Sequence, residues 1–461
     1  MHTLPFLRYL RANGSRLTFV AYPFLTPKVT KMHQPTPALP RRARLAATAL
    51  AVAALTGFAA AQPTLPPPPA PSIADARPTQ AELAAIARQK EFADWVTAFR
   101  ATARAAGIGE KTLRVAFDAV QYVPRAVELD GAQPEFTRTV WEYIDRAVTP
   151  QRVALGREKL LQLRAEADAA AARYGVPPNI LVAIWGMESN YGSNYGDIPT
   201  IDALATLGFE GRRADWARSQ LLAALKILQS GDIDRAHMIG SWAGAMGQTQ
   251  FLPSSFLAYA VDADGDGRRD IWGSMADVLA STANFLARSG WQANQPWGAE
   301  VRLPPEFDVG RADAQVRQSS AQWAAEGVKA MDGAPLPQFA DGAVLLPAGA
   351  RGPAFLTGPN FRAILRYNNS TSYALAVALL AQRLTDGPEV QAPWPRDLQA
   401  ITRAQLLELQ TALNERGFDS GSPDGLMGPA TRTAVRRYQR SIGLPADGYP
   451  SLDLLQRLQA P

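Results

Sequence analysis

The chain of 461 residues contains no cysteine. Thiolate nucleophiles, cysteine metal sites and disulfides are therefore excluded. Histidine is almost as scarce, because only His2, His33 and His237 occur, and the first two lie in a segment that we interpret below as a removed leader. This leaves almost nothing for a serine–histidine pair or a multi-histidine metal site. Acid–base chemistry must therefore depend mainly on carboxylates, assisted by tyrosine or lysine.

Acidic residues are absent from residues 1–61, which makes the overall positive charge misleading. The whole chain has 47 Lys and Arg against 42 Asp and Glu, but eight of the basic residues lie in 1–61. The remainder is slightly acidic. That balance gives no support to a nucleic-acid-binding surface, and we expect no nucleic-acid partner.

The first 61 residues have the pattern of an export signal. A basic RRAR at 41–44 precedes an alanine-rich apolar run that ends in three alanines at 59–61, as in a cleavable secretory signal peptide. Met32 is an alternative start. An uncleaved membrane anchor fits less well, because the run is short and ends in a cleavable pattern. Without a cysteine to carry a lipid, we expect a soluble periplasmic protein that is not lipid-anchored and has no membrane span after cleavage.

Composition divides the remaining chain. Proline-rich PTLPPPPAPS begins a spacer, and PWPR near 395 marks a second one. Between them lies a long region rich in Ala, Leu and Arg, with helical periodicity and little strand signal. The predicted order is leader, Pro-rich linker, catalytic domain, linker and small C-terminal module: 1–61, 62–78, 79–386, 387–397 and 398–461.

Helix-forming residues dominate the central region. Residues 156–174 predict one uninterrupted helix that is broken by Gly175, and a second helix is expected at 215–229. A short β element is expected around 299–346. The catalytic region is therefore predicted to be mainly α.

Glu188 is the most informative residue of the chain. In a helical segment, Leu181, Ile184, Trp185 and Glu188 fall on one face, so a carboxyl points the same way as three large apolar side chains. Burial raises a carboxyl's pKa, and a neutral carboxyl can donate a proton to a glycosidic leaving group. The alternative is a Glu at the end of a core helix that reaches past Gly192 into water.

A second motif lies about fifty residues further on, SWAGAMGQTQFLPSS at 241–255. Its glycines permit close backbone approach to a ligand, while Gln248 and Gln250 offer amide donors and acceptors, as a sugar groove requires. Taken alone, the segment would equally suit tight helix packing.

Four motifs in order resemble one known family. They are GMESNYG (186–192), AGAMGQTQFLPSS (243–255), DADGDGRRDIW (262–272) and RYNNSTSYALAV (366–377), and AQPEFTRTVWEY (132–143) fits as well. Together they resemble the membrane-bound lytic murein transglycosylase B family over roughly residues 90–385. The resemblance implies a mainly α fold, with a goose-lysozyme-like catalytic domain, an additional α lobe and a minor β element.

The resemblance also implies site residues. Glu188 corresponds to the family's single catalytic acid/base, and Phe285 stands where some relatives have tyrosine. The substrate-binding residues expected around Glu188 are Ser241, Met246, Gln248, Gln250, Tyr367 and Tyr373. Tyr367 and Tyr373 are six residues apart and need not share a helix face, so their proximity is an implication of the family.

The predicted mechanism depends on whether a second carboxylate is present. A retaining glycosidase needs one about 5–5.5 Å from the acid, and an inverting enzyme needs one further away. Asp197 and Asp202 are nearest in sequence, but we interpret Asp202 as a cap or surface residue. The resemblance supplies the other route, in which the C6 hydroxyl of muramic acid attacks and closes a 1,6-anhydro ring. A hydrolytic muramidase and a non-catalytic peptidoglycan-binding protein are the competing functions.

An acidic loop suggests a metal ion. DADGDGRRD (262–270) has the first half of an EF-hand calcium loop, but Gly273 occupies the position of the closing Glu. The resembling family has a lengthened loop closed by a later acid. The predicted ligands of a structural Ca²⁺ are therefore Asp262, Asp264, Asp266, Arg268 (through its carbonyl) and Asp277. No cofactor is expected to be required for the chemistry, and the alternative is a polar turn without an ion.

The C-terminal segment resembles a small three-helix peptidoglycan-binding module. The resemblance depends on AspGly at 424–425 and 447–448, on GPAT at 428–431, and on TyrGln at 438–439. A tethered module raises the effective concentration of substrate at the catalytic domain. We expect a monomer that binds peptidoglycan glycan strands.

Overall fold

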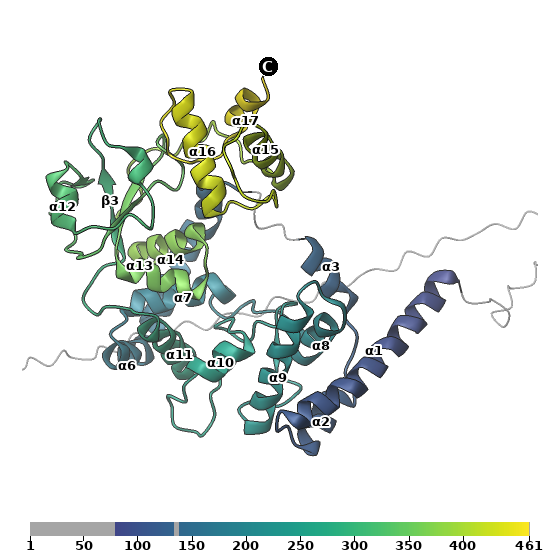
Figure 1. The fold of residues 1–461 in the computed structure, drawn as a ribbon. Helices are drawn as coiled ribbons and strands as arrows, with labels where there is room; N and C mark the ends of the chain where they lie inside the picture. Colours follow the sequence, from purple (N-terminus) through teal and green to yellow (C-terminus); the bar gives the residue numbers. More distant parts are fainter. Residues whose placement is uncertain (1–78, 133–137, 461) are drawn as a thin grey trace, which may run out of the picture. The chain divides into compact units, whose positions relative to one another are not determined.

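The computed structural model describes residues 79–132 and 138–460, so the predicted leader at 1–61 and the whole first linker at 62–78 lie outside the described residues. The described chain is mostly helical, which confirms the predicted fold class (Figure 1). Its α-helices are α1 Gln80–Ala105, α2 Glu110–Phe117, α3 Pro124–Ala132, α4 Val140–Ala147, α5 Pro150–Gln162, α6 Arg164–Tyr174, α7 Pro178–Ser189, α8 Thr200–Glu210, α9 Ala214–Ser230, α10 Pro253–Tyr259, α11 Met275–Arg288, α12 Ser320–Ala325, α13 Pro359–Tyr367, α14 Thr371–Leu384, α15 Arg403–Glu415, α16 Pro429–Ser441 and α17 Leu452–Gln459.

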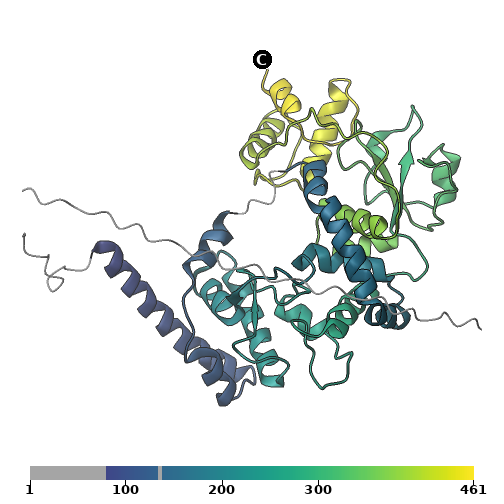
Figure 2. The same cartoon turned by 180° about the vertical axis from the view of Figure 1, so that it is seen from behind.

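Helix α7 lies inside the main hydrophobic core. It begins at Pro178, whose fixed φ suits the first helical position, and every residue from 180 to 186 is buried. A helix that is apolar all round must be enclosed by protein, and α5, α6, α11 and α14 contact it. Helices α4 and α5 also pack on α14, as the view from behind shows (Figure 2). Asn190 ends α7 with a left-handed φ of 49°, so Glu188 lies in the last turn.

The uninterrupted helix predicted at 156–174 is wrong. The segment contains two helices, α5 and α6, which meet at Leu163 with φ −104° and ψ 28°. Helix α5 packs on α7 and α14, whereas α6 packs mainly on α11. The chain bends because its two halves have different partners, which helix propensity does not encode. The predicted break at Gly175 is confirmed, since this residue caps α6 in the left-handed conformation. The helix expected at 215–229 is also confirmed, as α9.

The predicted β element is confirmed as a four-stranded antiparallel sheet. Its strands are β3 Gly298–Arg302, β4 Lys329–Ala330, β5 Ala343–Leu345 and β6 Ala354–Thr357, in the order β4-β3-β6-β5. The sheet has its own small core around the fully buried Trp323, whose indole N–H donates to the Gly342 carbonyl. We call residues 298–357 the β lobe. It includes the 3₁₀ helix η3 Val309–Arg311 and helix α12.

A second, two-stranded sheet lies in the catalytic region. Its strands are β1 Ile198–Pro199 and β2 Ile239–Gly240, which pair antiparallel, and β1 contacts α8. The pairing joins the chain just after α7 to the chain just before the 241–255 motif, so it brings two predicted site segments together.

The C-terminal module consists of α15, α16 and α17, as predicted. Each of its two AspGly turns is held by a glutamine amide. Gln410 accepts the N–H groups of Asp424 and Gly425, and Gln439 accepts the N–H of Gly448 while donating to Asp447. The module therefore repeats one structural device, a buried glutamine on a helix that fixes the turn following it.

The segment predicted as the second linker, 387–397, is held against the catalytic region. Glu300 accepts the backbone N–H groups of Gln391 and Ala392, and Arg396 pairs with Asp145 at 2.6 Å. Trp394 packs beside Trp141. The segment therefore follows the surface of the catalytic region and is anchored to it at several points.

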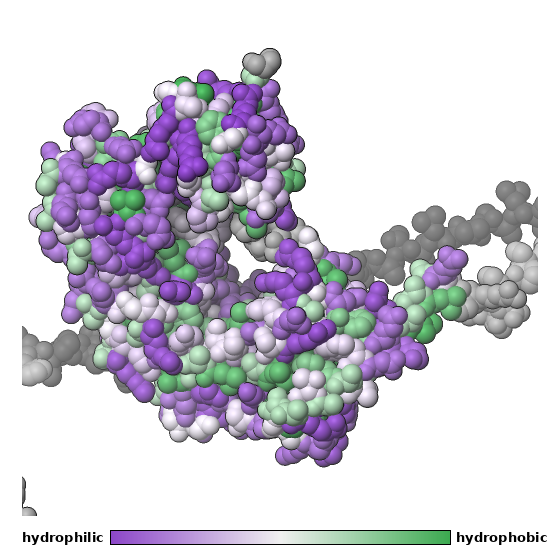
Figure 3. All heavy atoms as spheres, in the orientation of Figure 1, coloured by the Kyte–Doolittle hydropathy of each residue, from purple (hydrophilic) through white to green (hydrophobic). Residues whose placement is uncertain are grey.

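Among the helices described, none combines the length and the apolar character that a membrane crossing requires. The face shown in Figure 3 is mainly hydrophilic over the β lobe and the C-terminal module.

Candidate active site

Glu188 lies in the last turn of α7 with its side chain half-buried. The hydroxyl of Tyr373 donates a hydrogen bond to Glu188 Oε1 at 2.5 Å. Burial raises the pKa of Glu188 to about 7, and the hydrogen bond from Tyr373 opposes that rise without cancelling it. A substantial fraction of this carboxyl is therefore protonated near neutral pH, as a proton donor requires.

Tyr367 and Tyr373 come together beside Glu188. Tyr367 ends α13 and donates its hydroxyl to the Thr249 carbonyl at 2.7 Å, whereas Tyr373 lies in the first turn of α14. Burial raises the pKa of both hydroxyls well above the ordinary value, and the charge of Glu188 adds to the rise. Both tyrosines therefore remain neutral, and only the hydroxyl of Tyr373 contacts the acid directly.

Tyr143 on α4 is a third tyrosine near the acid, and it is not among the predicted site residues. Burial raises its pKa first, then the charge of Glu188, while Arg152 lowers it. It is the last residue of the 132–143 motif, which was the one signal that could have marked it. Tyr143 and Glu188 are 45 positions apart in the sequence, so no local periodicity connects the two.

The 241–255 motif is a series of tight turns until α10 begins at Pro253. Ser241 closes a turn in which its Oγ accepts the Ala245 N–H. Met246 is fully buried, and its backbone pairs with Gly240 and Phe251. The segment is therefore built by backbone pairing, and Gly244 also packs closely against Leu204 of α8, where a Cβ would lie 2.6 Å from the leucine side chain.

Both the oxygen and the nitrogen of the Gln248 side-chain amide form hydrogen bonds within the protein. Its Oε1 accepts the Trp185 indole N–H at 2.8 Å, and its Nε2 donates to the Trp272 carbonyl at 2.6 Å. Gly192, at φ 78°, makes room for it, since a Cβ there would lie 2.2 Å from that Oε1. Gln248 thus connects α7, the loop after α7 and the turn before α11 from a buried position beneath the site.

Gln250 is half-buried and adopts a left-handed φ of 51°. Its Nε2 donates to the carbonyls of Tyr195 and Gly247, both at 2.9 Å. Its Oε1 accepts no hydrogen bond within the described part of the chain, so one acceptor is left for a ligand. Phe285 is buried and packs against Tyr367, with ring centroids 4.8 Å apart.

The acids nearest in sequence do not accompany Glu188. Asp197 is exposed. The interpretation of Asp202 as a cap or surface residue is wrong, because its side chain is buried, pairs with Arg235 at 2.5 Å and accepts the Gln121 N–H. Within residues 79–132 and 138–460, no second carboxyl contributes to the pKa shift of Glu188.

The predicted metal loop gathers three carboxylates. One oxygen each of Asp262, Asp264 and Asp266 lies within 4.8 Å of the others. The carboxylates accept hydrogen bonds from the backbone of the loop. The N–H groups of Gly265 and Gly267 donate to Asp262, and that of Arg268 donates to Asp266. Clustered oxygen donors on a tight glycine-containing loop are the ligand type that calcium prefers.

Asp277 is not a member of that group of three. It is fully buried at the start of α11, and its two oxygens accept the N–H groups of Ala263 and Asp270, both at 2.7 Å. Burial raises its pKa. Ser274, the N-cap of α11, donates to Asp264 at 2.6 Å. Asp277 therefore fastens the loop to α11 by hydrogen bonds.

Two protein families match the chain. Residues 91–382 match the family described as Transglycosylase SLT domain, and residues 402–458 match the family described as Putative peptidoglycan binding domain. The first match covers more than half of the chain.

Individual relatives agree with these matches. The membrane-bound lytic murein transglycosylase B of Escherichia coli (strain K12) is 36% identical over 247 residues, which are 52% of this chain and 66% of that protein, slightly less than two thirds of its length. Two crystal structures of SltB3 from Pseudomonas aeruginosa, in complex with NAG-anhNAM-pentapeptide and with NAG-NAM-pentapeptide, are 52% and 53% identical. Each covers 80% of this chain and 99% of that chain, with a TM-score of 0.78.

A solved structure of the Escherichia coli lytic transglycosylase Slt35 in complex with calcium is also similar, at 30% identity and a TM-score of 0.55. The match covers 64% of this chain and 92% of that chain. The chain therefore belongs to the family of lytic transglycosylases that carry the SLT domain.

Proposed function

We propose that this chain is a lytic murein transglycosylase that cleaves the β-1,4 bond between MurNAc and GlcNAc of peptidoglycan without water, giving 1,6-anhydroMurNAc ends. The observation that carries the proposal is Glu188, a lone carboxyl with a pKa raised to about 7 and a tyrosine as its hydrogen-bond partner. A hydrolase would need a second carboxylate beside it.

The proposed reaction uses Glu188 twice. Its protonated oxygen first donates to the glycosidic oxygen, so that the bond from MurNAc C1 to that oxygen breaks and GlcNAc leaves with a new hydroxyl. The Glu188 carboxylate then accepts the proton of the C6 hydroxyl as O6 bonds to C1. The acid regains its proton, and holding the C6 hydroxyl close to C1 replaces an external nucleophile.

Tyr373 supports both protonation states of Glu188. Its hydroxyl holds one carboxyl oxygen and stabilises the negative charge after the first proton transfer. We assign to Ser241, Gln250 and Tyr367 the binding of saccharide groups, and to the buried Met246 and Gln248 the support of the groove wall. The free Oε1 of Gln250 suits an N-acetyl N–H.

We further propose that the acidic loop holds a structural Ca²⁺ through Asp262, Asp264, Asp266 and the carbonyl of Arg268, with Asp277 closing the loop. A bound calcium would neutralise the clustered carboxylates. The Slt35 relative in complex with calcium supports this assignment. Because Asp277 and Ser274 attach the loop to α11, the bound ion would contribute to the stability of the fold.

We assign the domain boundaries as predicted and place the protein in the periplasm as an exported monomer that is free of a lipid anchor. The C-terminal module would hold the chain on the wall. Separation of membrane and soluble fractions after osmotic shock tests the location, and recovery in the membrane fraction would refute it.

Mass spectrometry of the products of sacculi tests the activity. Purified chain should release muropeptides ending in 1,6-anhydroMurNAc, one water lighter than reducing-end products, and the Glu188→Gln variant should release none. Reducing ends would identify a hydrolytic muramidase. If neither the parent chain nor the Glu188→Gln variant releases soluble products, and the chain still pellets with sacculi, the protein would be a peptidoglycan-binding protein without catalytic activity.

A further inference from the structure

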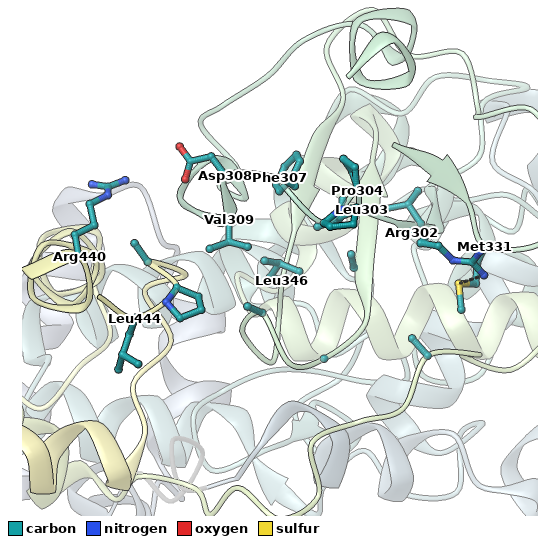
Figure 4. Close-up of a pocket in the computed structure, with 18 residues that line it drawn as sticks. Arg302, Leu303, Pro304, Phe307, Asp308, Val309, Met331, Leu346, Arg440 and Leu444 are labelled. Carbon is teal, nitrogen blue, oxygen red and sulfur yellow. Dashed lines mark hydrogen bonds between the residues drawn. The ribbon is translucent and has the colours of Figure 1, made fainter. Parts of the chain in front are cut away.

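A cleft of about 670 Å³ lies between the β lobe and the C-terminal module (Figure 4). One wall is formed by residues that follow strand β3, and the other by the end of α16 and the turn after it. The volume lies within the range of roughly 300–1,000 Å³ that is typical of small-ligand sites. The Glu188 site does not contribute to its lining.

The two walls are held together by specific contacts. Arg436 on α16 pairs with Asp313 of the β lobe at 2.8 Å, and the two side chains are only 11% and 23% exposed. Asp447 accepts the Ala350 N–H at 2.8 Å. Gly310 lies against Arg440 so closely that a Cβ would be 2.6 Å from its Nη2. The cleft is therefore a preformed feature of the docked module.

Charge and polarity are distributed unevenly along the cleft. Arg440 and Arg302 lie at its opposite sides in Figure 4, with apolar side chains between them. Neither arginine pairs with a carboxylate within 4.0 Å among the described residues. Asp308 is the only acid of the lining, and it accepts the Gly310 N–H. The apolar part of the lining includes Leu303, Pro304, Val309, Leu346, Leu444 and Pro445.

We propose that this cleft binds the peptide stem of peptidoglycan, a short peptide with free carboxylates and small apolar side chains. The proposal rests on the proposed function. Arginine guanidinium groups match carboxylates in charge and geometry, and the apolar stretch between them matches alanine methyls. One wall belongs to the segment that matches a peptidoglycan-binding domain. A bare sugar strand fits less well, because Phe307 is the only aromatic residue of the lining.

Such a site would hold the peptide of a strand while Glu188 acts on the glycan. It would give the chain a preference for strands that carry stems over strands stripped of them, independent of contacts at Glu188.

Titration calorimetry with a synthetic, sugar-free stem pentapeptide tests the site on the full-length chain carrying Glu188→Gln. Arg302→Ala and Arg440→Ala should each weaken binding at least tenfold. Arg437→Ala is the matched control, because Arg437 is exposed on the same helix and lies outside the cleft. Each of the three substitutions removes one positive charge. A difference in peptide affinity between them would therefore come from the position of the arginine in the cleft. Unchanged melting temperatures would verify folding.

Three outcomes would overturn the proposal: no binding of the pentapeptide by the parent chain, equal weakening by Arg437→Ala, or displacement of the pentapeptide by millimolar inorganic phosphate. Addition of a peptide-free glycan should leave peptide binding intact, since that glycan occupies the Glu188 groove. Product analysis of sacculi is a separate measurement, so a failure of the proposed function and a failure of this site can be told apart.

Discussion

Glu188 and the Asp262–Asp266 loop contain the same functional group in opposite surroundings. Glu188 is half-buried among apolar and tyrosine side chains, and burial raises its pKa to about 7. The three aspartates lie on an exposed or half-exposed loop and accept hydrogen bonds from backbone N–H groups. One environment disfavours the charge and produces a proton donor, while the other collects charge and suits a cation. The role of each carboxyl therefore depends on whether its surroundings disfavour or stabilise the negative charge.

The largest expected effect comes from removing the enclosed carboxyl. Glu188→Gln should lower strand cleavage by about 10³-fold or more, because general acid–base catalysis contributes about 10²–10⁴-fold. Release of anhydro-muropeptides from sacculi measures this. Glu158→Gln, on the exposed face of α5, should retain full activity. Cleavage by the Glu188→Gln variant within tenfold of the parent would place the acid elsewhere.

The loop should respond to calcium in stability while leaving catalysis unchanged. At free calcium about 100 times its dissociation constant, linkage predicts a gain of about 2.7 kcal/mol in the free energy of unfolding. Asp264→Asn should abolish the calcium-dependent rise in melting temperature. Asp168→Asn, on the surface of α6, should preserve the rise. A melting temperature that does not change between calcium and chelator would contradict the proposed ion.

The pH dependence of stability reports on Glu188 alone when the parent is compared with Glu188→Gln. The folded pKa of about 7 lies above the ordinary value of 4.5, so this carboxyl costs no stability below 4.5. Between pH 4.5 and 7 the unfolded chain releases this proton while the folded chain keeps it, so the parent loses stability across that window. Above pH 7 the loss relative to the variant levels off at about 2 kcal/mol. That figure applies about 1.4 kcal/mol per pKa unit, reduced for partial exposure. Urea unfolding at pH 4 and pH 8 measures the difference, and a constant difference would contradict the raised pKa.

The smallest effect is expected from Tyr373→Phe. Loss of the hydrogen bond should lower activity about tenfold. Because that bond lowers the pKa of Glu188, its removal should also shift the alkaline limb of the activity profile to higher pH. Tyr174→Phe on α6 is the control and should change neither value. A shift to lower pH would mean that Tyr373 does not stabilise the ionised carboxyl.

Much of the fold could be predicted from the sequence because its signals are local. Proline at 177–178 and the apolar run to Trp185 mark the start and body of α7, and the ordered motifs placed Glu188 in a lysozyme-like domain. The helices of the C-terminal module and the β lobe followed from similar patterns. The metal loop was visible as spaced aspartates.

Other features depended on contacts between distant segments. Tyr143 on α4 lies close enough for the charge of Glu188 to raise its pKa. The buried Asp202 pairs with Arg235, and the Gln248 amide bonds to Trp185 and Trp272. The bend at Leu163 follows from the different partners of α5 and α6.

The sequence by itself determined which side chains could do chemistry: few histidines, no cysteine, one carboxyl on an apolar helix face, and three spaced aspartates. Only the tertiary structure decided how those groups behave, because a pKa, a buried ion pair and a cleft between two lobes depend on the water excluded and the charges gathered when distant segments pack. The sequence specifies which functional groups are present. Packing then sets the polarity of the surroundings of each group and the partners that it contacts.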